Sequence, residues 1–140
     1  MAFIKKGNLC GFIHKDGHDF CHPQFQYVDG MLKYVKEDYF SALQGTYWGY
    51  IHRYSFNYIP FNYDAVGYFS EGFACVVKNG CLGYVDKNGN EIIPCRFANG
   101  NDFSEGMAAI MTHEYKWGYI NKKGEIIRFA ERRPDSQAVF

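Results

Sequence analysis

The chain has 140 residues, of which 47% are hydrophobic and 21% charged, a composition that excludes a disordered segment and suits one folded domain. Its 15 basic and 15 acidic residues cancel, which argues against the bulk positive field of a dedicated nucleic-acid binder. Aromatic residues make up 19% of the sequence, and this bias favours β-strands.

No apolar run near the N-terminus has the length of a signal peptide, and no segment has the length and apolarity needed to span a bilayer. The five cysteines include no Cys-x-x-Cys pair, which is typical of reduced thiols rather than of a secreted disulfide framework. We therefore expect a cytoplasmic protein without membrane association.

The first predicted β-hairpin spans residues 10–23 and reads Cys-Gly-Phe-Ile-His before a Lys-Asp-Gly turn. A further strand is predicted at 30–36, because its sequence matches a strand that recurs later in the chain. The link from there to Trp48 is longer than in later copies, and residues 38–43 could form a helical turn within it.

The same hairpin pattern recurs at residues 48–60, 82–94 and 117–127. The clearest turn is 87–90, whose Asn-Gly step supplies the positive φ of a tight hairpin. We expect Pro60 and Pro94 to end the second strands, because proline cannot donate to a ladder.

A glycine follows the first residue of every hairpin, as at Gly49 and Gly83. A residue without a Cβ at this place should let a neighbouring backbone or ring approach closely.

Between the hairpins the segment Phe-Ser-Glu-Gly recurs at 69–72 and 103–106 and leads into a strand of small and apolar residues. Because Glu71 and Glu105 occupy the same turn position, we expect local acceptor roles beside Ser70 and Ser104. Paired catalytic carboxylates are the alternative that this repetition disfavours.

These segments resemble the WG-repeat family, also called KWG repeats, over about residues 9–129. Leu82 and Cys10 replace the tryptophan of that pattern, His14 and His52 replace its aspartate, and Arg128 stands near the last proline position. The resemblance implies only that such repeats occur widely in bacterial proteins of mostly unknown role.

The predicted fold is all-β, with tandem β-hairpin repeats whose antiparallel strands stack in a solenoid-like or propeller-like single domain. The predicted units are 9–46, 47–80 and 81–115, followed by a closing half-repeat at 116–129 and a tail at 130–140.

A cysteine nucleophile with histidine is the first enzyme hypothesis to weigh, but most cysteines stand where other copies carry core residues, as Cys75 does at the place of Ala109. We therefore expect buried, inert thiols. His14, His18 and His22 are the metal candidates, although their spacing matches no strong zinc pattern and exposed polar residues at a hairpin tip are the alternative. We expect no cofactor and no enzymatic activity.

Tyrosine and phenylalanine exceed what the repeat pattern uses, and they serve either an interface or cross-strand packing. A small cluster of arginines lies near the C-terminus. The candidate binding residues are Tyr39, Phe40, Tyr54, Tyr63, Arg128, Arg132 and Arg133.

We expect a non-enzymatic protein-binding module whose partner is another protein or a nucleoprotein complex, with no small-molecule substrate. Its size suits a small inhibitor, immunity or anti-defence protein that blocks a bacterial partner. One alternative is a nucleic-acid or nucleoprotein binder that uses exposed Tyr, Phe and Arg. Another is an enzyme or metal-binding protein that uses His14, His18 and His22.

Overall fold

The computed structural model describes residues 2–7, 9–13, 20–25, 27–28, 38–52 and 58–129, with side chains from residue 38 onward in these ranges. The described residues contain β-strands and turns and no helix. In chain order the strands are β1 (Ala2–Lys6), β2 (Leu9–Ile13), β3 (Phe20–Phe25), β4 (Tyr27–Val28), β5 (Tyr39–Gln44), β6 (Tyr47–His52), β7 (Tyr58–Tyr63), β8 (Ala65–Val66), β9 (Phe73–Lys78), β10 (Cys81–Asp86), β11 (Glu91–Phe97), β12 (Asn99–Gly100), β13 (Met107–Met111), β14 (Trp117–Asn121) and β15 (Ile126–Phe129).

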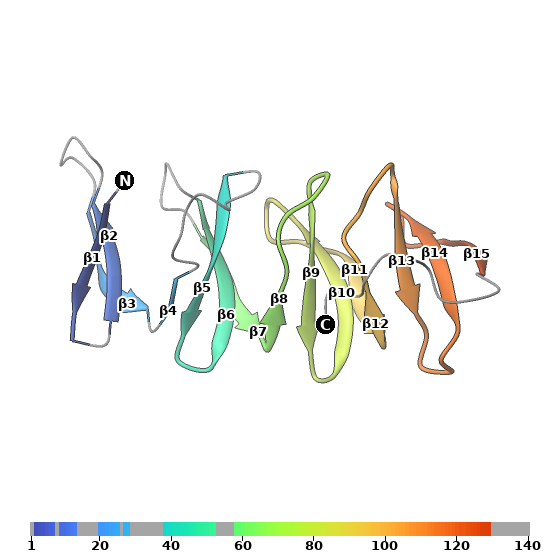
Figure 1. The fold of residues 1–140 in the computed structure, drawn as a ribbon, viewed down its shortest axis with the longest axis horizontal. Helices are drawn as coiled ribbons and strands as arrows, with labels where there is room; N and C mark the ends of the chain where they lie inside the picture. The colour runs from blue at the N-terminus through green and yellow to red at the C-terminus, as the bar shows by residue number, and fades with distance from the viewer. Residues whose placement is uncertain are drawn as a thin grey trace. The chain divides into compact units, whose positions relative to one another are not determined.

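The strands pair in antiparallel sheets that stay open, and each sheet is made of strands that are consecutive in the chain (Figure 1). One compact unit, Met1–Tyr63, holds the three-stranded sheet β1-β2-β3 and the four-stranded sheet β4-β5-β6-β7. The other unit, Asp64–Phe140, holds the four-stranded sheets β8-β9-β10-β11 and β12-β13-β14-β15. The predicted all-β fold of tandem antiparallel hairpins is confirmed.

Each sheet of the second unit combines the last strand of one sequence repeat with the hairpin of the next repeat. Strand β9, which follows the Phe-Ser-Glu-Gly turn, pairs with β10 of the next hairpin, from Phe73 opposite Asp86 to Lys78 opposite Cys81. The structural repeat therefore begins with a two-residue strand, as at 65–66 and 99–100, and ends with the second strand of a hairpin, as at 91–97 and 126–129.

The hairpin predicted around residues 87–90 is present. Gly89 has a φ of 84°, and the Asp86 carboxylate accepts hydrogen bonds from the backbone N–H groups of Asn88 and Asn90 at 2.9 and 3.0 Å. The turn is thus fixed by one glycine in the left-handed region and by one acceptor side chain that precedes it.

We expected the second strand of each hairpin to end at its proline, but both strands continue beyond it. β11 continues through Pro94 to Phe97, and β7 continues through Pro60 to Tyr63. In both hairpins the register shifts opposite the repeated glycine, between Leu82 and Tyr84 in β10 and between Trp48 and Tyr50 in β6. The proline lies in this β-bulge, where the ladder does not need its N–H.

The repeated glycine faces the bulge. A Cβ at Gly83 would lie 2.5 Å from the carbonyl oxygen of Ile93, and a Cβ at Gly49 would lie 2.6 Å from that of Ile59. Real Cβ atoms do not come this close to backbone oxygens. The predicted close approach of a neighbouring backbone at the repeated glycine is therefore confirmed.

The helical turn predicted at 38–43 is wrong, because β5 occupies residues 39–44 and pairs with β6 along its whole length. β5 is the counterpart of β9, and Asp38, with a φ of 67°, precedes it where Gly72, with a φ of 84°, precedes β9. Residues 39–44 of the link to Trp48 are therefore a regular repeat strand. The strand predicted at 30–36 lies outside the described residues.

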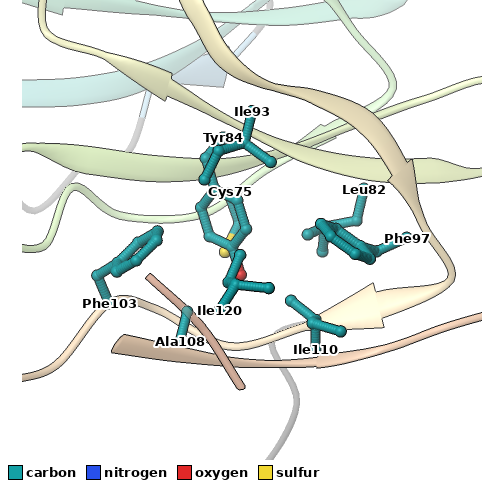
Figure 2. Close-up of a cluster of buried hydrophobic side chains, with 9 residues drawn as sticks. All are labelled: Cys75, Leu82, Tyr84, Ile93, Phe97, Phe103, Ala108, Ile110 and Ile120. Atoms are coloured by element: carbon teal, nitrogen blue, oxygen red, sulfur yellow. The ribbon is translucent and has the colours of Figure 1, made fainter. Parts of the chain in front are cut away.

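The core of the second unit surrounds Tyr84, whose ring lies between Phe103 on one side and Leu82 and Phe97 on the other (Figure 2). The rings of Tyr84 and Phe103 meet edge to face, with their centroids 4.9 Å apart. The cluster contains residues of β9, β10, β11, β13 and β14, and Phe103 from the connection between β12 and β13, so it joins the unit's two sheets. Its members are Cys75, Leu82, Tyr84, Ile93, Phe97, Phe103, Ala108, Ile110 and Ile120.

Candidate functional site

Consecutive Ser-Glu-Gly turns of the second unit are bonded to each other. The Ser70 hydroxyl donates to the Phe103 carbonyl oxygen at 2.8 Å, and Glu71 Oε1 accepts from the Gly106 N–H at 2.9 Å. The expectation that Glu71 acts only within its own turn is therefore wrong, because its acceptor role reaches the next repeat.

The charge of Glu71 is held by groups of the following sheet. The hydrogen bond from the Gly106 backbone lowers the pKa of the Glu71 carboxyl, and Lys122, whose Nζ lies 3.4 Å from Oε1, lowers it further. Lys122 also donates to the Glu71 carbonyl oxygen at 3.0 Å. The turn of one sheet thus binds both the turn and the hairpin of the next.

The inner part of the same interface uses β10 and β11. The Tyr84 hydroxyl donates to the Asn101 carbonyl oxygen at 2.7 Å, and Arg96 Nη2 donates to the Gly124 carbonyl oxygen at 2.6 Å. Ile93, which pairs with Tyr84, is fully buried and lies against the turn at Gly124. The sheet β8–β11 is therefore covered by the sheet that follows it.

The Ser-Glu-Gly turn at 104–106 has the same geometry as the turn at 70–72, but no following turn is present among the described residues. Glu105 has the same φ of 54° as Glu71, and Ser104 bridges to Met107 as Ser70 does to Phe73. Ser104 and Glu105 are both exposed, and among the described residues no further turn bonds to their side chains. Within the described residues, the series of turns that are bonded to each other therefore ends at Ser104 and Glu105.

β15 has no covering sheet within the described residues. Ile127 is 50% exposed, whereas its counterpart Ile93 in β11 is fully buried, and Phe129 is 55% exposed. Ile126 is 43% exposed, about as much as its counterpart Ile92 at 42%. β15 is also the edge strand of its sheet. We call Ile126, Ile127, Arg128 and Phe129 the β15 patch.

Arg128 of this patch stands at the place of Pro94 in the sequence pattern, but its strand pairing differs from that of the preceding hairpin. It pairs with Tyr119, whereas the buried Ile93 pairs with the equivalent Tyr84. Its guanidinium carbon lies 4.8 Å from the centroid of the Tyr119 ring, within the range of a cation–π contact. β15 therefore exposes apolar side chains together with one arginine whose guanidinium lies over a tyrosine ring.

The predicted binding residues do not form one surface. Phe40 and Tyr63 are 1% and 4% exposed, so they are core residues and their assignment to a binding surface is wrong. Tyr39 is half-buried, with its ring 5.1 Å from the ring of His52. Arg128 is exposed in β15. Tyr54, Arg132 and Arg133 lie outside the described residues.

The metal hypothesis cannot be placed on the described part of the chain. His14 and His18 lie outside it, and His22 belongs to β3, of which only the backbone is described. Where side chains are described, no three His, Cys, Asp or Glu residues are grouped so as to hold a metal ion. The same part of the chain has no helix long and apolar enough to cross a membrane.

The sequence pattern does not distinguish Ile127 and Phe129 as surface residues, because Ile127 stands at the place of the buried Ile93. Tyr115 and Tyr58, at 82% and 67% the most exposed of the large hydrophobic side chains described, lie outside β15.

The open antiparallel sheets and the bonded turns define a β-repeat protein, and within the second unit one sheet packs on the next. The family model of the WG containing repeat matches residues 48–80, 83–115 and 117–127. The chain belongs to this family, as the repeated hairpins predicted. Comparison with the curated proteins and with the solved structures gives no match.

Proposed function

We propose that the chain is a non-enzymatic protein-binding module that holds its partner on the β15 patch. One observation carries this proposal: Ile127 of β15 is 50% exposed, whereas Ile93, at the same place in the hairpin of the preceding sheet, is fully buried, and β15 also exposes Phe129 at 55%. Ile127 occupies the position through which Ile93 packs against the following sheet, which supports a packing role for this part of the surface.

The partner that fits this surface is an extended segment of another protein. The free edge of β15 offers backbone groups to an added strand, and the exposed Ile127 and Phe129 offer apolar contacts to alternate side chains of that strand. An acidic residue in the segment would pair with Arg128, which Tyr119 holds in place. Large apolar side chains around one arginine are also the usual composition of an interaction hot spot.

An inhibitor, immunity or anti-defence protein would act through such a surface by occupying a partner's site. We propose these roles as more specific forms of the protein-binding function. A cytoplasmic location remains a prediction of the sequence. No specific observation favours nucleic-acid binding, since the formal net charge is zero.

The test is affinity capture from the source cells with the full-length chain and two single variants. Ile127→Asp places a charge in the middle of the β15 patch. Tyr115→Asp is the matched control, because this side chain is 82% exposed, lies outside β15 and has a φ of 65° that aspartate tolerates. We expect wild type and Tyr115→Asp to retain the same partner and Ile127→Asp to lose it.

Melting temperatures of the three proteins complete the experiment. Loss of the partner at an unchanged melting temperature supports the proposal, because position 127 is surface-exposed and its substitution should cost less than about 0.5 kcal/mol. Partner retention by Ile127→Asp contradicts it. Loss of the partner together with a fall in melting temperature would show that position 127 serves folding instead.

A further inference from the structure

Two hairpin connections of the second unit bring a thiol and an imidazole together. Cys81 begins β10, directly after the turn at 79–80, and His113 lies in the connection between β13 and β14. Both connections lie at the same, lower end of these sheets in Figure 1. Cys81 Sγ is 3.6 Å from His113 Nε2, which is within hydrogen-bond distance for sulfur.

The described cysteines differ in their surroundings. Cys75 is fully buried, and burial raises the pKa of its thiol well above the ordinary value. Cys95 is partly buried, and burial, followed by the nearby Glu91 carboxylate, raises the pKa of its thiol. Cys81 is partly exposed and, among the thiols whose side chains are described, is the one in contact with an imidazole.

We propose that Cys81 is a site of covalent modification by low-molecular-weight disulfides, with His113 as the proton acceptor. This goes beyond partner binding and does not depend on it. The expected burial of the thiols holds for Cys75, whereas Cys81 and Cys95 are only partly buried. Cys81 stands at a hairpin position where the preceding sheet exposes Tyr47.

The reaction is a thiol–disulfide exchange. The unprotonated Nε2 of His113 accepts the proton of the Cys81 thiol, and the resulting thiolate attacks one sulfur of the disulfide. The bond between the two sulfurs of the reagent breaks as the bond to Cys81 forms. The leaving thiolate then takes the proton from the imidazolium, so that the products are a mixed disulfide on Cys81, one free thiol and a neutral histidine.

Oxidised glutathione is the probe, added to the native full-length chain, and peptide mass analysis follows the modification of each cysteine separately. We expect Cys81 to react at least about tenfold faster than Cys95 and Cys75, because Cys81 alone among these thiols contacts an imidazole that can accept its proton, and Cys75 is buried. His113→Gln, which keeps the size of the side chain but not its basicity, should slow Cys81 by about fivefold or more. It should leave the rate at Cys95 and the melting temperature unchanged.

Glu114→Gln is the control for a change of charge in the same connection, and it should leave the Cys81 rate within about twofold of wild type. Two results would overturn the proposal. One is a Cys81 rate that His113→Gln does not change. The other is a parallel slowing of Cys81 and Cys95 in that variant, which would mean that the histidine acts through local packing.

Discussion

Tyr84 and Asn101 join two neighbouring sheets by a buried hydrogen bond, in which the Tyr84 hydroxyl donates to the backbone carbonyl oxygen of Asn101 at 2.7 Å. Burial raises the pKa of Tyr84 far above its ordinary value, with a further contribution from the neighbouring Cys75. The phenol is therefore a neutral donor at any pH at which the protein folds. Its ring fills the core of the unit while its hydroxyl binds the next repeat.

Tyr84→Phe should lower the free energy of unfolding by about 1 kcal/mol, the net worth of one buried hydrogen bond. The loss stays near this value because Cys75 Sγ also donates to the Asn101 carbonyl oxygen, at 3.3 Å, which leaves that oxygen with a donor. Tyr119→Phe, in the last sheet, is the matched control and should cost less than about 0.5 kcal/mol. Denaturant unfolding measures both, and equal losses would contradict the assigned bond.

Gly83→Ala should be among the most destabilising single substitutions in the chain. The new Cβ would meet the Ile93 carbonyl oxygen at 2.5 Å and the Cys95 nitrogen at 2.6 Å, and both are backbone atoms that cannot turn away. We expect a loss of about 3 kcal/mol or more. Thermal or denaturant unfolding of the purified variant measures it.

Gly118→Ala is the control for this substitution, because the nearest atom to its Cβ would be the Arg128 carbonyl oxygen at 3.1 Å. Its cost should stay near 1 kcal/mol or below, about what alanine in place of a strand glycine can regain or lose. A Gly83→Ala variant as stable as Gly118→Ala would show that the bulge can move aside and that the glycine is not required.

Glu71 should give stability a pH dependence of known sign. Its pKa is lowered in the folded state, chiefly by the Gly106 N–H, so the ionised carboxylate favours folding above the pKa of the unfolded chain. That contribution disappears as the pH falls through the lower, folded-state pKa. The difference in melting temperature between wild type and Glu71→Gln should therefore be present at pH 7 and shrink below about pH 4.3.

Glu105→Gln provides the comparison at pH 7. This glutamate has the same backbone conformation but no following turn within the described residues, so its substitution should change the melting temperature less than Glu71→Gln does. A melting-temperature difference for Glu71→Gln that grows as the solution becomes acidic would have the wrong sign for the bond described here.

The repeated features of the fold could be predicted because each arises from local chemistry. The Asn-Gly turn at 87–90 requires a positive φ, and the glycine that faces the β-bulge leaves room for a backbone. Features that depend on pairing could not be predicted in this way. Pro60 and Pro94 lie inside strands because a register shift removes the need for their N–H, and no single strand sequence shows that shift.

The first copy was misaligned for a similar reason. A glycine at position 30 matched the repeated Gly72, but Asp38 adopts the left-handed conformation before the repeat strand, which aspartate does at modest cost. Phe40, an aromatic residue of this strand, therefore belongs to the core. The exposure of Ile127 in the last sheet is not predictable from the pattern either, because the same position is buried in the two preceding hairpins.

Site-specific crosslinking tests the proposed binding surface most directly. A photoreactive phenylalanine analogue is placed at position 127 in the β15 patch, and in a second protein at position 115, and each is illuminated in the source cells. We predict one dominant crosslinked protein from position 127 and none from position 115, with the crosslink mapping to an extended segment of the partner. Crosslinks from position 115 with none from position 127 would contradict the account.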